Sequence, residues 1–344
     1  MDTASISKFD YHLPIEQIAN KPLPRRDYSK LMYLDTTSSN LRNSTFSDII
    51  DFVQKGDLLV LNDTKVIPGR ISLKKETGGA VEILFHRPIS KNIFEAIFSS
   101  SRPLKINSKL FYKNKNFFKV LSTRENYVTL VEESNKSIMD ILKKIGIIPL
   151  PKYIKRPVTD QDKRRYQTVY ASKHGSVAAP TAGLHFTKKT INKLIDKGVK
   201  INYLTLHVTY NTFRPIDNDD YNKHKIGKEF FMVNKLLFDN IKNAKLKNKK
   251  VIAVGTTVAR TLEHCFSKNI TTDFQGYTDL FIKPGYDFKI IDSLLTNFHL
   301  PKSSLLLLVC AFAGKDKILK AYKYAVANNY RFYSYGDCMF INKS

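Results

Sequence analysis

Residues 150–344 alternate short apolar strands with helices, and this alternation constrains the fold more than any other feature of the chain. Apolar runs such as "INYLTLHVTY" (201–210), "VIAVG" (251–255) and "SLLTN" (293–297) predict strands. Helical patterns precede or follow them at residues 188–198, 234–250, 256–266, 305–314 and 316–329. Strands that alternate with helices favour a mostly parallel sheet covered on both faces. We therefore predict an α/β domain.

A different pattern fills residues 66–148. Short alternating segments are separated there by Gly, Ser, Asn and Pro, a spacing typical of a small β-barrel or sandwich. The preceding run "DLLVLN" (57–62) again predicts a buried strand. We predict that an inserted small β-barrel domain (66–148) interrupts a large, mostly parallel-sheet α/β domain formed by residues 1–65 and 149–344.

The charge of the chain indicates an anionic partner. Its 344 residues include 56 Lys and Arg against 31 Asp and Glu, a net charge of +25. Such a field attracts polyanions, so nucleic acid is the expected partner and an anionic membrane surface is the alternative.

The same sequence argues against a membrane span and a metal site. The N-terminus has no apolar signal region, and the longest apolar run (305–313) is shorter than the roughly 20 residues a membrane helix needs. The three cysteines show neither CxxC pairing nor a histidine at metal-ligand spacing. We expect a cytoplasmic protein without membrane association or bound metal.

Polar side chains follow the predicted strands where each strand ends, which is where open α/β sheets bind ligands. One group follows strand 251–255 at the start of a helix and consists of Thr256, Thr257 and Arg260. Free N–H groups and the helix dipole favour a carboxylate or phosphate there, although a helix cap with a surface arginine is the alternative. The other strand-end groups are Thr296, Asn297 and His299, and His207, Asn211, Thr212 and Arg214.

An uncharged loop of small residues, "GSVAAPTAGLHFT" (175–187), ends close to a third histidine, His185. Small residues let the backbone approach a flat ligand, and Thr181 adds a polar group. His185 is of a type that titrates near neutrality. The alternative is a tight buried turn that leads into a helix capped by Thr187.

Two stretches are strongly basic. Residues 152–173 interleave lysines and arginines with Tyr153, Tyr166 and Tyr170, a mixture that suits phosphates and unpaired bases. The lysine-rich stretch 240–250 is more typical of a solvated helix face.

Several blocks in order along the chain resemble one family. They include "FDYHLP" (9–14), "GDLLVLNDTKVIPGR" (56–70), "GSVAAPTAGLHFT" (175–187), "VIAVGTTVARTLE" (251–263), "TNFHLPKSSLLLLVCAFAG" (296–314) and "YRFYSYGDCMFI" (330–341). Together they resemble the S-adenosylmethionine:tRNA ribosyltransferase-isomerase family of queuosine biosynthesis. The resemblance implies an α/β domain with an inserted β-barrel.

The implied reaction transfers and isomerises the ribosyl group of S-adenosylmethionine onto 7-aminomethyl-7-deazaguanine at the tRNA wobble position. Adenine and methionine leave, and epoxyqueuosine remains. S-adenosylmethionine is then a co-substrate, and no metal or cofactor is implied. The expected partners are S-adenosylmethionine and a tRNA with a GUN anticodon, and the expected enzyme is a monomer.

Roles for individual residues follow as hypotheses. We expect His185 and His299 to share the general base and acid duties, with His207 in reserve. We expect the substrates to contact Asp63, Thr181, Thr256, Thr257, Arg260, Asn297 and Asp337, with Arg260 and Thr256 on the methionine carboxylate. Asp63 and Asp337 are alternatively turn or cap residues. The tRNA phosphates are expected on Arg25, Arg26, Lys152, Lys155, Arg156, Arg164 and Arg165.

Some positions depart from the family pattern. The glycine-rich "LHVGxGTF" is here "LHVTYNTF", with Thr209, Tyr210 and Asn211, and "HxMHxE" has Ile226 and Gly227 in place of Met and the second His. "GTTSxR" is here "GTTVAR". A tRNA-binding relative with weakened catalysis therefore remains an alternative. An S-adenosylmethionine-dependent RNA methyltransferase is the other, although the chain lacks a GxGxG loop.

Overall fold

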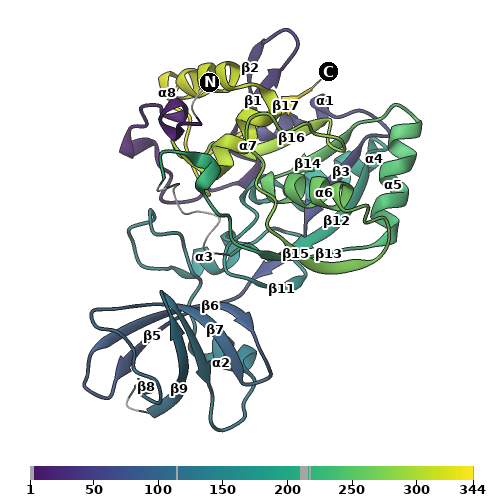
Figure 1. The fold of residues 1–344 in the computed structure, drawn as a ribbon. Helices are drawn as coiled ribbons and strands as arrows, with labels where there is room; N and C mark the ends of the chain where they lie inside the picture. Colours follow the sequence, from purple (N-terminus) through teal and green to yellow (C-terminus); the bar gives the residue numbers. More distant parts are fainter. Residues whose placement is uncertain (1–3, 114, 210–215, 217, 344) are drawn as a thin grey trace.

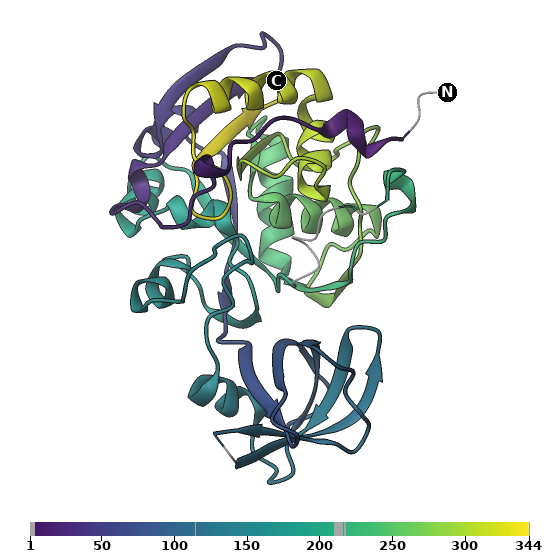
Figure 2. The same ribbon diagram turned by 90° about the vertical axis from the view of Figure 1, so that its left-hand side faces the viewer.

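Two bodies make up the protein, a large α/β domain and a smaller β-barrel beside one end of it (Figure 1). The computed structural model describes residues 4–113, 115–209, 216 and 218–343. A view turned by 90° shows the same separation, with the barrel connected to the α/β domain through the region around α3 (Asp160–Arg165) (Figure 2).

One nine-stranded sheet forms the centre of the α/β domain. The strands in spatial order are β15 (Phe274–Thr278), β13 (Glu229–Val233), β12 (Lys200–Leu206), β3 (Leu58–Asn62), β14 (Val251–Val254), β16 (Ser293–Asn297), β17 (Cys338–Asn342), β1 (Lys30–Asp35) and β2 (Leu41–Thr45). The four strands from β12 to β16 are parallel, and antiparallel pairs extend the sheet on both sides. The predicted fold class is confirmed, with a parallel centre inside a mixed sheet.

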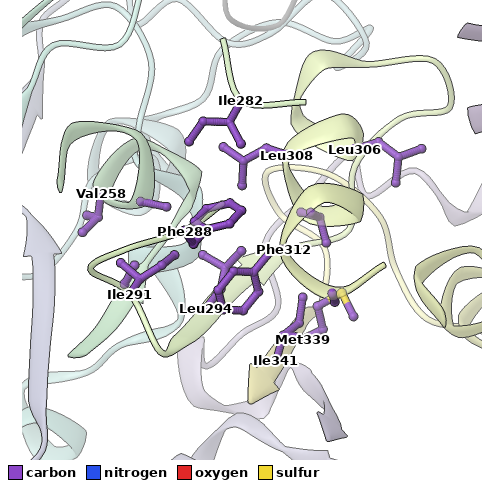
Figure 3. Close-up of a cluster of buried hydrophobic side chains, with 14 of the residues drawn as sticks. Val258, Ile282, Phe288, Ile291, Leu294, Leu306, Leu308, Phe312, Met339 and Ile341 are labelled. Carbon is purple, nitrogen blue, oxygen red and sulfur yellow. The ribbon is translucent and has the colours of Figure 1, made fainter. Parts of the chain in front are cut away.

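Helices cover both faces of this sheet, as the apolar strands require. The helices are α1 (Ile49–Phe52), α4 (Lys188–Asp196), α5 (Lys235–Leu246), α6 (Thr256–Ser267), α7 (Ser304–Ala313) and α8 (Lys315–Ala327). Alternate residues of β3 pack against opposite layers: Leu58 and Val60 join the core under α5 to α8, and Leu59 and Leu61 join the core under α1 and α4. Figure 3 shows side chains of α6 and α7 meeting Leu294 and Ile341 of the sheet in the first of these cores.

The ends of the helices form as their sequences predict. Thr187 Oγ1 accepts a hydrogen bond from the Thr190 N–H at 3.0 Å and caps α4. Ser303 Oγ accepts from the Leu306 N–H at 3.2 Å and caps α7. Both caps satisfy N–H groups that the first turn of a helix leaves without a partner.

The barrel is closed and antiparallel. Its strands in order around the barrel are β10 (Tyr127–Val131), β7 (Ile93–Ser100), β6 (Ala80–Pro88), β5 (Arg70–Lys75), β8 (Lys109–Tyr112) and β9 (Lys115–Arg124). It has its own apolar core, against which α2 (Ile138–Ile145) packs. All six strands lie inside the predicted insertion, and the domain boundaries at 66 and 148 stay predictions.

The sheet recruits strands that the sequence patterns did not indicate. β1 comes from the N-terminal part of the chain, where the sequence patterns predict no strand, and it pairs in parallel with β17 near the C-terminus. A small two-stranded sheet joins β4 (Thr64–Val66) to β11 (Lys173–Ser176). Within the described ranges, no helix combines the length and apolar character that a membrane crossing requires.

A buried carboxylate on α6 ties down the chain that enters β16. Glu263 is fully buried, and its side chain accepts hydrogen bonds from the backbone N–H groups of Lys289, Ile290 and Ile291 at 2.9–3.2 Å. Tyr286 adds a longer contact from its hydroxyl at 3.4 Å. This one side chain therefore orders a segment that has no secondary structure of its own.

Replacing Glu263 with alanine leaves buried N–H groups without acceptors. Because each such group costs about 1–3 kcal/mol, we expect Glu263→Ala to lower the free energy of unfolding by at least about 2 kcal/mol in urea denaturation. Glu263→Gln keeps one acceptor oxygen and is expected to lose less. An alanine variant within about 0.5 kcal/mol of the wild type, the range of ordinary surface substitutions, would contradict this role.

Candidate active site

Three adjoining pockets lie where the central strands end. The arginine pocket is lined by Pro22, Leu23, Arg25, Arg26, Ser29, Arg165, Leu184, His185, Ser334, Tyr335 and Gly336. The central pocket is lined by Tyr153, Thr181, Asn297, Phe298, His299, Leu300, Ser303, Leu305, Tyr333 and Ser334. The helix-end pocket is lined by Ile226, Thr256, Thr257, Arg260, Leu280, Phe281, Ile282, Ser304, Leu305 and Leu308. Ser334 lines the first two pockets and Leu305 the last two, so the three are contiguous.

His299 lies in the central pocket as a neutral, well-held ring. Its Nε2 is hydrogen-bonded to Thr296 Oγ1 at 2.8 Å, and its backbone N–H donates to the Tyr322 hydroxyl at 3.1 Å. Tyr11 donates its hydroxyl to the His299 carbonyl. Burial lowers the pKa of His299 to about 3. The ring is therefore uncharged at neutral pH.

His185 lies at the boundary between the arginine and central pockets. Its Nδ1 is hydrogen-bonded to Ser29 Oγ at 2.7 Å, and its ring stacks on Phe46 with centroids 5.3 Å apart. Its Nε2 is buried and has no hydrogen-bond partner among the described residues. Burial lowers the pKa of His185 to about 4, an effect that the side chain of Asn297 opposes.

Asn297 carries the second unpaired polar atom of this boundary. Its amide nitrogen donates to the Tyr333 carbonyl at 2.9 Å, which leaves its Oδ1 buried without a partner in the described structure. Tyr333 itself has a φ of 73°, in the left-handed region that bulky residues rarely adopt. Strained residues of this kind cluster at functional sites. The buried His185 Nε2 and Asn297 Oδ1 make this boundary the part of the three pockets where polar atoms without a hydrogen bond in the described structure come together.

Sequence reasoning missed three residues of this boundary, Ser29, Tyr333 and Ser334, and it named Tyr153 only as an aromatic residue of the basic stretch 152–173. Tyr153 and Tyr333 approach with ring centroids 4.1 Å apart, and the Tyr153 and Ser334 hydroxyls are hydrogen-bonded. The only available signal was the "YSYGD" segment (333–337), in which Asp337 alone was singled out.

The helix-end pocket contains the predicted anion seat in a modified form. Thr256 and Thr257 begin α6 after Gly255, whose φ of 94° suits glycine. Arg260 lines the pocket, but it is buried and forms an ion pair with Glu229, which is also buried. Burial lowers the pKa of Arg260 to about 10. A ligand carboxylate would therefore share this guanidinium with Glu229.

His207 lies outside the three pockets. Its Nδ1 is hydrogen-bonded to Thr64 Oγ1 at 2.7 Å, its ring stacks on Phe230, and burial lowers its pKa to about 4. A Cβ added at Gly175 would lie 2.5 Å from His207 Nε2. The absence of a side chain at Gly175, the first residue of the small-residue loop, therefore leaves room for the His207 ring.

The rest of that loop is a buried turn that also reaches the pockets. Val177, Ala178 and Ala179 are buried, and the 3₁₀ helix η5 (Thr181–His185) carries Thr181 and His185 to the cleft. A Cβ at Gly183 would lie 2.1 Å from the Tyr170 hydroxyl. The small residues of this loop therefore allow close packing. The loop is a buried turn, as one prediction had it, and it also brings residues to the pockets, as the other had it.

Asp63 and Asp337 use their carboxylates within the protein. Asp63 accepts hydrogen bonds from the hydroxyls of Thr205 and Ser172 at 2.6 and 2.7 Å. Asp337 is buried and accepts from the backbone N–H groups of Lys30 and Arg331 at 2.9 and 2.8 Å. Neither lines the three pockets, and their substrate-binding roles stay predictions.

The predicted tRNA-binding cations fall into two groups. Arg25, Lys152, Lys155 and Arg164 are exposed, although Arg25 also forms a two-point ion pair with Asp27 at 3.0 and 3.2 Å, whereas Arg26, Arg156 and Arg165 are partly buried and held by internal contacts. Arg26 donates to the carbonyls of Leu184 and Arg164 at 2.9 and 3.1 Å. Arg156 forms a two-point ion pair with the buried Asp162 at 2.6 and 2.8 Å.

Arg165 differs from the other internally held cations. Its Nη1 donates to the Pro24 carbonyl at 2.9 Å, while its Nε is buried without a partner in the described part of the chain. Arg165 and Arg26 both line the arginine pocket.

Tyr210, Asn211, Thr212 and Arg214 lie beyond the described residues, so the predictions made for them stay open. Among residues that the structure describes, no group of three or more His, Cys, Asp or Glu side chains is placed to hold a metal ion.

Comparison with known proteins shows which family the chain belongs to. A family model for a queuosine biosynthesis protein matches residues 6–341. The chain belongs to this family. It is 48% identical to the S-adenosylmethionine:tRNA ribosyltransferase-isomerase of Sulfurihydrogenibium sp. and 46% identical to that of Halothermothrix orenii, in each case over 98% of this chain and 99% of the relative.

A solved structure supports the fold of this queuosine biosynthesis family member. The crystal structure of S-adenosylmethionine tRNA ribosyltransferase from Thermotoga maritima shares 33% sequence identity and a TM-score of 0.58 with it. The match covers 97% of this chain and all of that one. The predicted family and the prediction of a transferase are confirmed, whereas the roles of single residues stay predictions.

The contact between Gly175 and His207 gives a test of the loop. Gly175 has a φ of 150°, and an added Cβ would meet the His207 ring. We expect Gly175→Ala to lower the melting temperature and to shift the imidazole signals of His207 in NMR spectra. Gly285→Ala is the control, because Gly285 also has a positive φ but open space around its Cβ position. Equal losses in the two variants would show that the ring contact does not matter.

The buried neutral histidines predict acid sensitivity. His185 and His299 have pKa values of about 4 and 3 in the folded chain, below the ordinary value of about 6.5 in the unfolded chain. The unfolded state therefore binds more protons below about pH 6.5, and stability falls as the pH drops toward 4, by about 1.4 kcal/mol per pH unit for each proton.

Urea denaturation between pH 7 and pH 4.5 measures this loss, and the double variant His185→Gln/His299→Gln is the comparison. We expect the slope of stability against pH to be shallower in the variant by nearly two protons. Parallel slopes in the two proteins would contradict burial of neutral rings at these positions.

Proposed function

We propose that this chain transfers and isomerises the ribosyl group of S-adenosylmethionine onto 7-aminomethyl-7-deazaguanine at the wobble position of tRNA, giving epoxyqueuosine-tRNA, adenine and methionine. The observation that carries the proposal is the 46–48% identity to S-adenosylmethionine:tRNA ribosyltransferase-isomerases over 98% of the chain. S-adenosylmethionine is a co-substrate, and no metal or further cofactor takes part. The proposed RNA substrate has a GUN anticodon, and the enzyme acts as a cytoplasmic monomer.

The three pockets differ in chemistry in a way that supports this assignment. Among the described residues that line it, the central pocket has no Asp, Glu, Lys or Arg side chain and is rich in aromatic and aliphatic groups, which suits an uncharged base. The helix-end pocket offers the first turn of α6 and Arg260 to the methionine carboxylate. The arginine pocket offers Arg26 and Arg165 to an RNA phosphate.

The reaction needs a proton acceptor and a proton donor near the sulfonium. In the proposed course, a base takes a proton from the carbon next to the sulfonium, and adenine leaves after it receives a proton. The amine of the deazaguanine then adds, and closure of the epoxide expels methionine. His185 is the proposed base, because its buried Nε2 forms no hydrogen bond of good geometry within the described residues and its low pKa keeps it neutral at pH 7.

His299 and Asn297 complete the proposed site. His299 Nε2 is engaged with Thr296, so its role is to line the pocket and to exchange protons through that hydroxyl. Asn297 Oδ1, which forms no hydrogen bond within the described residues and whose side chain acts on the pKa of His185, is the proposed acceptor for a ligand N–H. Thr181 lines the same pocket and adds a hydroxyl.

One assay tests the function. Purified protein is incubated with S-adenosylmethionine and an anticodon stem-loop that carries the deazaguanine amine, and the nucleoside is analysed by mass spectrometry. Epoxyqueuosine with an equal amount of free adenine supports the proposal. S-adenosylhomocysteine in place of adenine would identify a methyltransferase, and RNA binding without turnover would identify a non-catalytic relative.

The pKa of His185 predicts the pH dependence of the reaction. Because the base acts in its neutral form, we expect kcat/KM to fall at low pH with an apparent pKa near 4, well below the ordinary histidine value of about 6.5. We expect His185→Gln to reduce kcat at least about 100-fold, the usual contribution of a general base. His174→Gln is the matched control, since His174 is an exposed histidine outside the pockets. Wild-type turnover by His185→Gln would remove His185 from the mechanism.

A further inference from the structure

A cleft separate from the candidate active site lies between the barrel and the edge of the large sheet. Its volume is about 540 Å³, whereas each of the three pockets holds about 30 Å³ or less. The barrel contributes residues from β6, β7, β9 and β10, and the α/β domain contributes Lys228 and Tyr277, the latter on the edge strand β15. No lining residue is shared with the pockets described above.

Two cations in this cleft have no ion pair with any residue that the structure describes. Arg87 pairs with Glu95 at 2.8 Å, so its charge is already balanced. Arg124 of the barrel and Lys228 of the α/β domain are both exposed, and neither forms an ion pair within the described part of the chain. Glu125 is the remaining acidic group of the lining. The cleft thus presents one available cation from each domain to a ligand between them.

An aromatic ring is available beside these cations. The side chain of Tyr277 is 52% exposed, although aromatic groups of this size are usually more deeply buried. The rings of Tyr277 and Phe230 contact each other in a T-shaped arrangement with centroids 5.5 Å apart, and the Phe230 ring stacks on that of His207. The contact with Phe230 therefore fixes one side of Tyr277, and the rest of the ring is exposed to the cleft.

A ring and cations of this kind match the chemistry of single-stranded nucleic acid. Bases stack on exposed aromatic rings, and basic side chains hold the phosphates that connect them. Most of the lining residues are charged or polar, which favours an anionic, base-carrying ligand at this cleft.

We propose that the cleft binds a single-stranded segment of the tRNA next to the nucleotide in the candidate active site. Tyr277 stacks on a base of that segment, and Arg124 and Lys228 hold its phosphates from opposite sides. The barrel then binds the RNA directly, a role that its sequence does not indicate. This inference rests on the proposed function, because it assumes that tRNA is the substrate.

The test compares tRNA binding by the full-length protein and its variants. Fluorescence anisotropy with unmodified tRNA is measured from 50 to 300 mM salt for the wild type, Arg124→Gln/Lys228→Gln, Tyr277→Ala and Tyr277→Phe. Arg102→Gln is the charge control. Arg102 follows the end of β7, whereas Glu95, which lines the cleft, lies near the start of that strand. Melting curves establish that each variant is folded.

We expect three results. The double variant binds at least about tenfold more weakly at low salt, and its slope of log affinity against log salt is smaller by about 1.4, since each phosphate contact with a single strand contributes about 0.7. Tyr277→Ala weakens binding roughly tenfold without a change in slope, because stacking carries no counterion effect. Tyr277→Phe and Arg102→Gln bind within about twofold of the wild type, since surface substitutions away from a contact have small effects.

Kinetics separate this inference from the proposed function. In the stem-loop assay, the cleft variants are expected to raise KM for RNA and to leave kcat and KM for S-adenosylmethionine unchanged. Wild-type affinity in the double variant and in Tyr277→Ala, with adenine still released, would overturn the cleft and leave the reaction intact. The expected binding losses without any adenine release would overturn the reaction and leave the cleft. Equal competition by duplex RNA and a single-stranded oligonucleotide would also overturn it.

Discussion

The burial of strand β3 on both faces is the constraint from which the site follows. Every residue of β3 is buried, and the parallel neighbours β12 and β14 leave it no contact with water along its length. Polar groups can therefore collect only where the strands end. Asn62 shows this at the end of β3: its side chain hydrogen-bonds both the N–H and the carbonyl of Leu206 and accepts from the Thr64 N–H. The ends of β14 and β16 supply Thr256 and Asn297 in the same way.

Buried polar groups divide into those whose hydrogen bonds hold the fold together and those that keep an atom without a hydrogen bond in the described structure. Asp162 satisfies its oxygens with Arg156, Thr159 and Tyr335, and so fixes α3 against the arginine pocket. In contrast, His185 and Asn297 each keep one buried atom without a hydrogen bond of good geometry among the residues that the structure describes. An unmet buried group costs about 1–3 kcal/mol, and two such groups at one boundary suit a surface completed by substrate.

Local patterns identified the parallel centre, the barrel and most of the residues at the strand ends, because apolar runs and caps act over a few neighbouring residues. They did not identify β1, since its partner β17 lies some three hundred residues away and pairing over that distance leaves no local signal. Ser29 and Tyr333 were missed for the same reason: one acts through a contact with His185, the other through its backbone angle. His207 follows a strand as expected, yet Thr64, Phe230 and Gly175 enclose it away from the pockets.

The low pKa of His185 creates a conflict that tRNA itself would relieve under the proposed function. A neutral imidazole can accept a proton at pH 7, but a pKa of about 4 makes it a weak base. Burial is the main cause, and the positive charges of Arg26 and Arg331 lower the pKa further. A phosphate seated in the arginine pocket would offset those charges and raise the pKa of the ring. Because burial is the larger cause, the phosphate would relieve the conflict only in part, and the ring would be a moderately stronger base when RNA occupies the arginine pocket.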